Sequence, residues 1–292
     1  MRYARLTALA AGPAAIAVGL AGAGPAGAQA PGDGNYQGEP LSGDIDGNGV
    51  ADRATLTKTN PATCDVVVEL GLGGGRFGPK RTYSYPEPRN EEFDFGYCPD
   101  MGVIVDLGGD GVSELVLAWF DGSPDPENLG DLLVLENFAP VAGFQAIYQP
   151  SEIGLAEFNG DGLADVYEWT DQGDGFQSWL NTPGGELVAG PVRACSSSSS
   201  PDFEIADFDR DGKDDLLVAA YGDTCTKPGE FLDHAFVVFD DGSTTELWPN
   251  WASDVELTDW GHNGIPDVIV TDGDTGVTHL FANDGHGHFA AK

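Results

Sequence analysis

The stretch "ADFDRDGKDDLLVA" (206–219) decides the fold, because its acidic pattern recurs along the chain. It reads D-x-D-x-D-G-x-x-D from Asp207 to Asp215. Related nine-residue segments begin at residues 44, 106, 157 and 259, so successive starts lie 62, 51, 50 and 52 residues apart. We number them loops one to five in chain order, which makes 207–215 loop four. Five copies at a near-constant spacing indicate a repeat protein in which each repeat is one supersecondary unit.

The five loops keep the side chains that a hard cation prefers. Each has glycine at its sixth position, where a loop that wraps an ion must turn sharply and a positive φ is expected. Oxygen-bearing side chains stand at positions 1, 5 and 9, whereas position 7 varies, as expected if only its backbone carbonyl is used. The candidate calcium ligands are Asp44, Asp46, Asn48, Val50 and Asp52; Asp106, Asp110, Val112 and Glu114; Glu157, Asn159, Asp161, Leu163 and Asp165; Asp207, Asp209, Asp211, Lys213 and Asp215; and Asp259, Asn263, Ile265 and Asp267.

Two other interpretations of the loops are ion-free acidic turns and a catalytic carboxylate pair. Ion-free turns do not explain why acidic residues recur at fixed positions. Catalysis by paired carboxylates needs two groups at one fixed separation, which five equivalent loops do not provide. We therefore expect up to five structural calcium ions. Loop four, with four carboxylates, should bind most tightly, and loop five, with Asp259, Asp267 and Asn263, most weakly.

The segments around each loop are short and strand-like rather than helical. "FEIA" (203–206) precedes loop four and "LLVAA" (216–220) follows it, so the loop joins two strands and is unlike an EF-hand. Further along each repeat comes a strand, a glycine-rich turn and often a phenylalanine, as in "HLFANDGHGHFA" (279–290). Four antiparallel strands in each repeat of about 50 residues are typical of a β-propeller blade. The fold class predicted is therefore all-β.

The loops and the "NDGHGHF" segment (283–289) resemble FG-GAP or VCBS-type repeats, as in the calcium-bearing blades of integrin α-subunit propellers. The resemblance covers residues 38–292, although Phe77-Gly78 is the one clean Phe-Gly pair and no clear Gly-Ala-Pro follows it. Integrin propellers have seven blades, whereas five loops imply five. We expect a single propeller domain with blades at 38–88, 99–150, 151–201, 202–252 and 253–292, closed by the fifth blade packing on the first.

The N-terminus predicts export. Arg2 and Arg5 precede an apolar segment at 7–22, and small residues offer a cleavage site after Ala28. Removal of this signal peptide (1–28) would leave a short segment at 29–37 before the propeller. A membrane anchor is disfavoured, because glycine and proline interrupt the apolar run and it is short for a span. We expect a secreted monomer that does not insert into a membrane.

The charge of the chain limits its partners. With 48 acidic and 13 basic residues, the net charge is −35. Such a chain repels nucleic-acid phosphates, so we expect no nucleic-acid partner.

The cysteine count suits an oxidising compartment. Cys64, Cys98, Cys195 and Cys225 form an even set, which in an exported chain suggests two disulfides. All four fall between strands on the face opposite the acidic loops. Local pairing, Cys64–Cys98 and Cys195–Cys225, is compatible with the blade geometry. A Cys64–Cys225 bond would cross the ring, farther than a disulfide spans.

The face opposite the loops is the predicted ligand face. Aromatic and acidic residues recur there, where the second strand of each repeat ends, and could stack on sugars or anchor a protein. Alternatively, the aromatics pack between blades and the aspartates form turns. The residues concerned are Trp119, Asp121, Trp169, Asp171, Tyr221, Asp223 and Asp272.

The function expected is a protein- or glycan-binding module rather than an enzyme. No G-x-S-x-G, H-E-x-x-H, P-loop or dinucleotide-binding motif appears in the sequence. The alternative is an extracellular carbohydrate-active enzyme on a propeller scaffold. The sequence does not identify the ligand.

Overall fold

The computed structural model describes residues 40–60, 62–90, 95–96, 98–119, 132–144, 150–170, 175–194, 202–223 and 231–292. Within these ranges the protein is all-β, as predicted. No helix in the described part of the chain is long and apolar enough to cross a membrane.

The strands form five sheets of four antiparallel strands, each in sequence order, together with one small hairpin. This is the number of sheets and strands expected of a five-bladed propeller. Sheet one contains β1 (Pro40–Gly43), β2 (Asp52–Asn60), β3 (Thr63–Glu69) and β4 (Arg81–Pro86); β5 (Arg89–Asn90) and β6 (Phe95–Gly96) form the hairpin. Sheet two contains β7 (Met101–Val105), β8 (Glu114–Ala118), β9 (Leu132–Glu136) and β10 (Ala139–Phe144).

The remaining three sheets follow the same plan, and β19 begins one residue before the expected blade boundary. Sheet three contains β11 (Glu152–Ala156), β12 (Asp165–Thr170), β13 (Gly175–Asn181) and β14 (Leu187–Ala194). Sheet four contains β15 (Asp202–Ala206), β16 (Asp215–Asp223), β17 (Phe231–Val238) and β18 (Thr244–Trp248). Sheet five contains β19 (Ala252–Thr258), β20 (Asp267–Asp272), β21 (Thr278–Asn283) and β22 (Phe289–Ala291).

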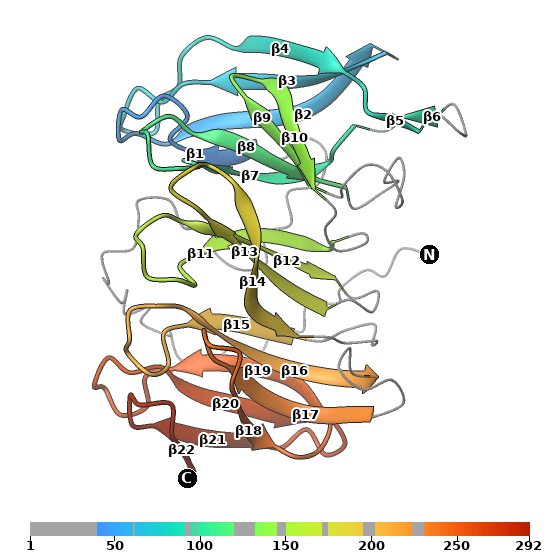
Figure 1. The fold of residues 1–292 in the computed structure, drawn as a ribbon. Coiled ribbons are helices and arrows are strands. Elements are labelled where there is room, and N and C mark those ends of the chain that lie inside the picture. The colour runs from blue at the N-terminus through green and yellow to red at the C-terminus, as the bar shows by residue number, and fades with distance from the viewer. Residues whose placement is uncertain are drawn as a thin grey trace.

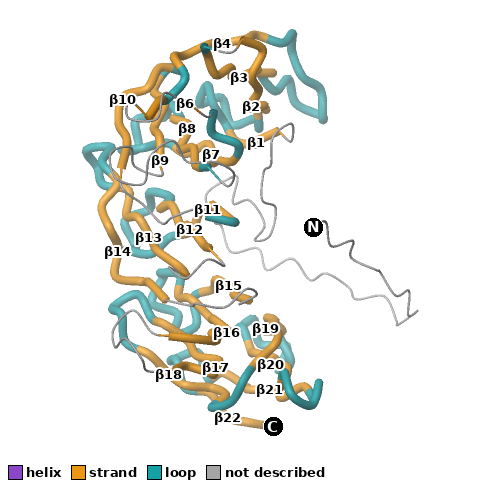
Figure 2. The backbone as a smooth tube through the Cα atoms, turned by 90° about the vertical axis from the view of Figure 1, so that its right-hand side faces the viewer, coloured by secondary structure: helices purple, strands orange, loops and turns teal. Residues whose placement is uncertain are grey.

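The five sheets stack face to face along an arc rather than a closed ring (Figures 1 and 2). The first strand of each sheet lies on the concave side, and the fourth strands of sheets one to four lie on the convex side (Figure 2). Sheets one and five stand at opposite ends, so the expected packing of the fifth blade on the first is not made. Neighbouring sheets pack through their apolar faces. A closed ring would also need sheet five to pack on sheet one, and no pattern in the sequence specifies that contact.

The core lies between neighbouring sheets. Strand β8, in the middle of sheet two, is buried on both faces and is wholly apolar after Glu114. Its Leu115 and Leu117 pack with Leu41 and Val66 of sheet one, whereas Val116 and Ala118 pack with Ile153 and other residues toward sheet three. Alternating residues of one strand thus serve two interfaces, which holds the sheets in series.

The disulfide Cys64–Cys98 joins β3 to the segment before β7 and confirms the first predicted pair. Its Cα atoms are 5.4 Å apart, within the usual span of a disulfide. It lies at the end of sheet one away from loop one, since Cys64 is next to the β2–β3 turn. The predicted Cys195–Cys225 pair lies outside the described residues.

Candidate metal centres

The acidic loops all lie at one edge of the stack, at the left in Figure 1. In each loop the carboxylate at position 1 closes the turn by accepting backbone N–H groups. In loop four, Asp207 accepts from the amides of Asp211 and Gly212 at 3.2 and 3.1 Å. Asp44, Asp106 and Asp259 accept at the same two positions, and Glu157 accepts from Asn159, Gly160 and Gly162.

The carboxylate at position 9 anchors the loop to the rest of its sheet. In loop four, Asp215 is fully buried and accepts from the amides of Phe208 and Asp240, each at 3.0 Å. One bond fixes the loop itself, and the other fixes the turn between β17 and β18. Burial raises the pKa of Asp215 to about 7 despite these two donors. Asp52 and Asp165 make the same pair of bonds. Asp267 accepts from the amide of Gly261, one position further along its loop, and from that of Asn283.

Position 5 has a similar role. The side-chain oxygen of Asp211 accepts from the amide of Lys213 at 2.9 Å, and the corresponding residue does the same in the other four loops. Positions 1, 5 and 9 are therefore explained by hydrogen bonds within the loop, whether or not an ion binds. Position 3 also accepts a backbone N–H in loops three and four, from Asp161 to Asn159 and from Asp211 to Asp209. The recurrence of oxygen-bearing side chains therefore does not by itself require a metal.

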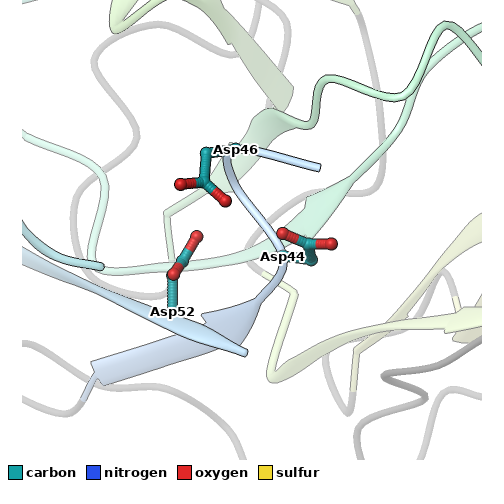
Figure 3. A group of neighbouring side chains, drawn as sticks. All are labelled: Asp44, Asp46 and Asp52. Carbon is teal, nitrogen blue, oxygen red and sulfur yellow. The ribbon is translucent and has the colours of Figure 1, made fainter. Parts of the chain in front are cut away.

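Position 3 separates the loops. Where it is aspartate, in loops one and four, three carboxylates converge with oxygens within 4.8 Å of one another. Figure 3 shows Asp44, Asp46 and Asp52 around one such space. Position 3 is Gly108 in loop two, Asn159 in loop three and Gly261 in loop five. Oxygen ligands converging from one short loop fit a hard cation such as calcium, and loops one and four offer the fullest sets.

The turn geometry is partly as predicted. Glycine at position 6 has positive φ in all five loops, between 71° and 90°. Position 4 is also left-handed, which the sequence analysis missed. Glycine occupies it in loops one to three, but Arg210 and His262 occupy it with φ of 61° and 51°. The glycines at position 4 of loops one to three, Gly47, Gly109 and Gly160, could have predicted a left-handed residue there. Arginine and histidine at this position in loops four and five break the pattern.

Neighbouring loops are joined to one another. Asp214, at position 8 of loop four, accepts from the amide of Glu157 in loop three at 2.8 Å, and its own amide donates to the Glu157 carbonyl. Ser113 of loop two donates to the Asp44 carbonyl of loop one at 2.6 Å. Arg210 of loop four donates to the carbonyls of Asn263 and Gly264 of loop five at 3.3 and 2.9 Å. These contacts depend on how sheets pack, which no single repeat reveals.

A lysine lies among the loop-four carboxylates. The Lys213 ammonium is 3.1 Å from Asp211 Oδ2 and also pairs with Asp240. These partners raise the pKa of Lys213 above its usual range. The Lys213 ammonium therefore lies beside the candidate calcium ligands of loop four. The predicted order of calcium affinities, which counted only carboxylates, did not include this positive charge.

Of the predicted ligand-face residues, the structure describes the surroundings of Trp119, Trp169 and Asp272. Trp119 and Trp169 are 1% and 4% exposed, and the Trp169 ring packs 4.9 Å from that of Phe203 in sheet four. Asp272 forms the β20–β21 turn by accepting from the amides of Asp274 and Thr275. The two tryptophans are therefore buried and Asp272 forms a turn, which is the alternative interpretation of these residues given by the sequence. Tyr221 and Asp223 are described only as part of β16, and Asp121 and Asp171 lie outside the described residues.

The comparisons with known proteins agree with this architecture. Residues 157–218, which include loops three and four, match the family model described as FG-GAP-like repeat. No curated protein sequence matches the chain.

Two solved structures are similar to this chain. One is an Agrocybe aegerita lectin studied for its recognition of non-reducing terminal N-acetylglucosamine, 16% identical, with a TM-score of 0.50 over 89% of this chain and 66% of that one. The other is a Bacillus licheniformis rhamnogalacturonan lyase, 14% identical, with a TM-score of 0.49 over 86% of this chain and 49% of that one. The chain thus spans about two thirds of the lectin and half of the lyase.

Proposed function

Because the chain carries an FG-GAP-like repeat, we propose that it is a secreted, calcium-stabilised binding module for a protein or glycan. The observation that carries the calcium part is the convergence of three carboxylates in loops one and four. Asp44, Asp46 and Asp52, and likewise Asp207, Asp209 and Asp215, would hold the ion. When bound, calcium would neutralise carboxylates that otherwise repel one another at close range.

Calorimetric titration of the full chain with calcium tests this part. We expect the tightest site in loop four, followed by loop one, with loop five weakest. Asp207→Asn should remove the tightest phase, and Asp259→Asn should leave it unchanged. A chain that binds no calcium at millimolar concentration, or that binds it most tightly at loop five, contradicts the assignment.

Export is supported by the disulfide and by the N-terminal sequence. Cys64–Cys98 would persist in an oxidising compartment and be reduced in the cytosol. Residues 1–28 have the charge and apolar pattern of a signal peptide. Fractionation of expressing cells, with sequencing of the mature N-terminus, should recover the chain outside the cell and beginning at residue 29.

Ligand binding is supported by the scaffold rather than by one sequence motif. The Agrocybe lectin, whose fold this chain shares, recognises a terminal sugar. A glycan array probed with the full chain, with and without a chelator, tests the glycan version of the proposal. Binding that weakens on chelation supports it, whereas no binding to glycans or to extracellular proteins contradicts it.

The enzyme alternative has one observation in its favour. Carboxylates of sheets three to five gather on the concave side, where Glu204 has its pKa raised to about 7 by burial and by Asp202 and Asp254. A carboxylic acid that stays protonated near neutral pH is what a glycosidase uses as its general acid. A polysaccharide-cleavage screen that compares the chain with its Glu204→Gln variant separates this alternative from binding alone.

A further inference from the structure

A cleft of about 360 Å³ opens between sheets one and two, at the edge that carries the acidic loops. We call it the β4–β10 cleft. Its floor is apolar and includes Leu70, Leu115 and Leu135. Its rim is polar, with Arg81, Asp46 and Asn137. An apolar hollow with a few converging polar groups is the usual form of a small-ligand site, and this volume lies in the usual range.

One wall of the cleft is built by a strained turn. Asn137 and Phe138 join β9 to β10 and have φ of 49° and 63°. Asn-Gly is the favoured pair in a two-residue turn of this type, because glycine accepts the left-handed conformation that a bulky residue resists. The Phe138 ring stacks on Tyr83 of β4, with ring centroids 4.0 Å apart and planes 16° apart. The strain therefore secures an aromatic wall that spans two sheets, and such outliers are found at ligand clamps.

The rim holds a positive charge at Arg81. Among the residues that the structure describes, none offers the exposed Arg81 guanidinium a hydrogen bond or an ion pair. The neighbouring cations are engaged, since Lys80 lies 3.7 Å from Glu69 and Arg53 lies over the Phe77 ring. Six of the 13 basic residues lie between 53 and 89, in a chain whose net charge is −35. Sheet one is thus where an anion meets least repulsion, and a guanidinium matches a carboxylate in geometry.

From this arrangement we propose that the β4–β10 cleft binds a uronate residue of an acidic glycan. The sugar carboxylate pairs with Arg81, and the apolar face of the ring lies against the wall of Tyr83 and Phe138. Hydroxyl groups donate to Asp46 and bond to the Asn137 amide. The inference rests on the glycan version of the proposed function and names its ligand class.

The polar rim favours this ligand over its competitors. A purely apolar ligand would leave Arg81 and Asp46 without partners. A sugar ring with one carboxylate, several hydroxyls and an apolar face can pair with Arg81, hydrogen bond to the other polar groups of the rim and pack against the aromatic wall.

The test is calorimetric binding of the full chain to a galacturonate trimer and a mannuronate trimer, each beside its carboxyl-reduced counterpart. We expect one of the acidic trimers to bind at least tenfold more tightly than its reduced form. Arg81→Gln should weaken that binding at least tenfold. Arg193→Gln, which alters an exposed arginine of β14 in sheet three, is the matched control and should have no effect.

A second variant guards against misfolding. Phe138→Gly relieves the left-handed strain but removes the aromatic wall, so affinity for the acidic trimer should fall, and thermal unfolding of the variant checks that the chain remains folded. Equal binding of the acidic and reduced trimers, or full binding by Arg81→Gln, overturns the inference. If neither trimer binds but another glycan does, the inference is wrong and the proposed function stands. If no glycan or protein binds, both are wrong.

Discussion

Two groups of carboxylates differ in what surrounds them: those of the loops and those on the concave side. In loops one and four, carboxylates held by backbone N–H groups converge around one space. On the concave side, Asp202 of β15 hydrogen bonds to Asp254 of β19, and the pKa of Asp202 is raised to about 6, chiefly by burial. The first arrangement suits a metal cation, whereas the second suits a shared proton. Carboxylates are thus brought together in two different ways within one fold.

The largest effect should come from removing a position-9 anchor. Asp215→Ala leaves the buried amides of Phe208 and Asp240 without acceptors, which should cost about 3 kcal/mol of unfolding free energy. Chemical denaturation in the presence of a chelator measures it, so that calcium plays no part. Asp274→Ala, in the exposed β20–β21 turn, is the control. A loss of under 1 kcal/mol would mean that position 9 matters only through an ion.

Position 3 should set calcium affinity without affecting the ion-free fold. Asp209→Asn removes one of three converging charges, so the dissociation constant of loop four should rise about tenfold. The reciprocal change, Gly261→Asp, should strengthen loop five. Calorimetry measures both, and unfolding in chelator serves as the control. If Asp209→Asn leaves calcium affinity unchanged, position 3 does not distinguish the loops.

Much of this loop chemistry could be predicted from the sequence, because it is local. The repeat, the position-6 glycines and the five four-stranded sheets follow from spacing and residue type. The features missed depend on neighbouring sheets. Asp214 turns toward Glu157, Trp169 packs on Phe203, and Lys213 reaches Asp240, none of which a single repeat encodes. Trp169 illustrates the limit, since an aromatic at a strand end can serve a ligand or a core.

The carboxylates on the concave side should make the protein less stable as the pH rises through neutrality. Burial and neighbouring carboxylates raise the pKa of Glu204 to about 7, above its unfolded value, so the folded state binds protons more strongly. Stability from this group is therefore fully present below about pH 4 and falls as the pH rises through 7. Glu204→Gln should stabilise the protein by about 1 kcal/mol at pH 8 and by much less at pH 4.

Denaturation at the two pH values measures the effect of Glu204→Gln. Glu186→Gln, an exposed residue before β14, is the control and should change neither value. Destabilisation by Glu204→Gln at pH 8 would show that the folded protein stabilises the charged form of Glu204. The concave carboxylates would then not be distinguished from those of the loops by sharing a proton.

The smallest effect should come from Lys213. Lys213→Met removes the ammonium beside Asp211, so loop four should bind calcium a few-fold more tightly, at a small loss of ion-free stability. Calcium titration and denaturation in chelator measure the two changes. Weaker calcium binding in this variant would mean that the lysine organises the loop rather than competing with the ion.

The most direct test of the central claim is the thermal unfolding of the full chain in calcium, in magnesium and in a chelator. Ions held only by the native state stabilise it by about 2.7 kcal/mol at a hundredfold excess over the dissociation constant. For a chain of this size the melting temperature should then rise by about 5 °C or more in calcium, and less in magnesium. In the double variant Asp46→Asn/Asp209→Asn, most of that rise should disappear. A melting temperature unchanged between calcium and chelator would contradict the account and leave the loops as ion-free turns.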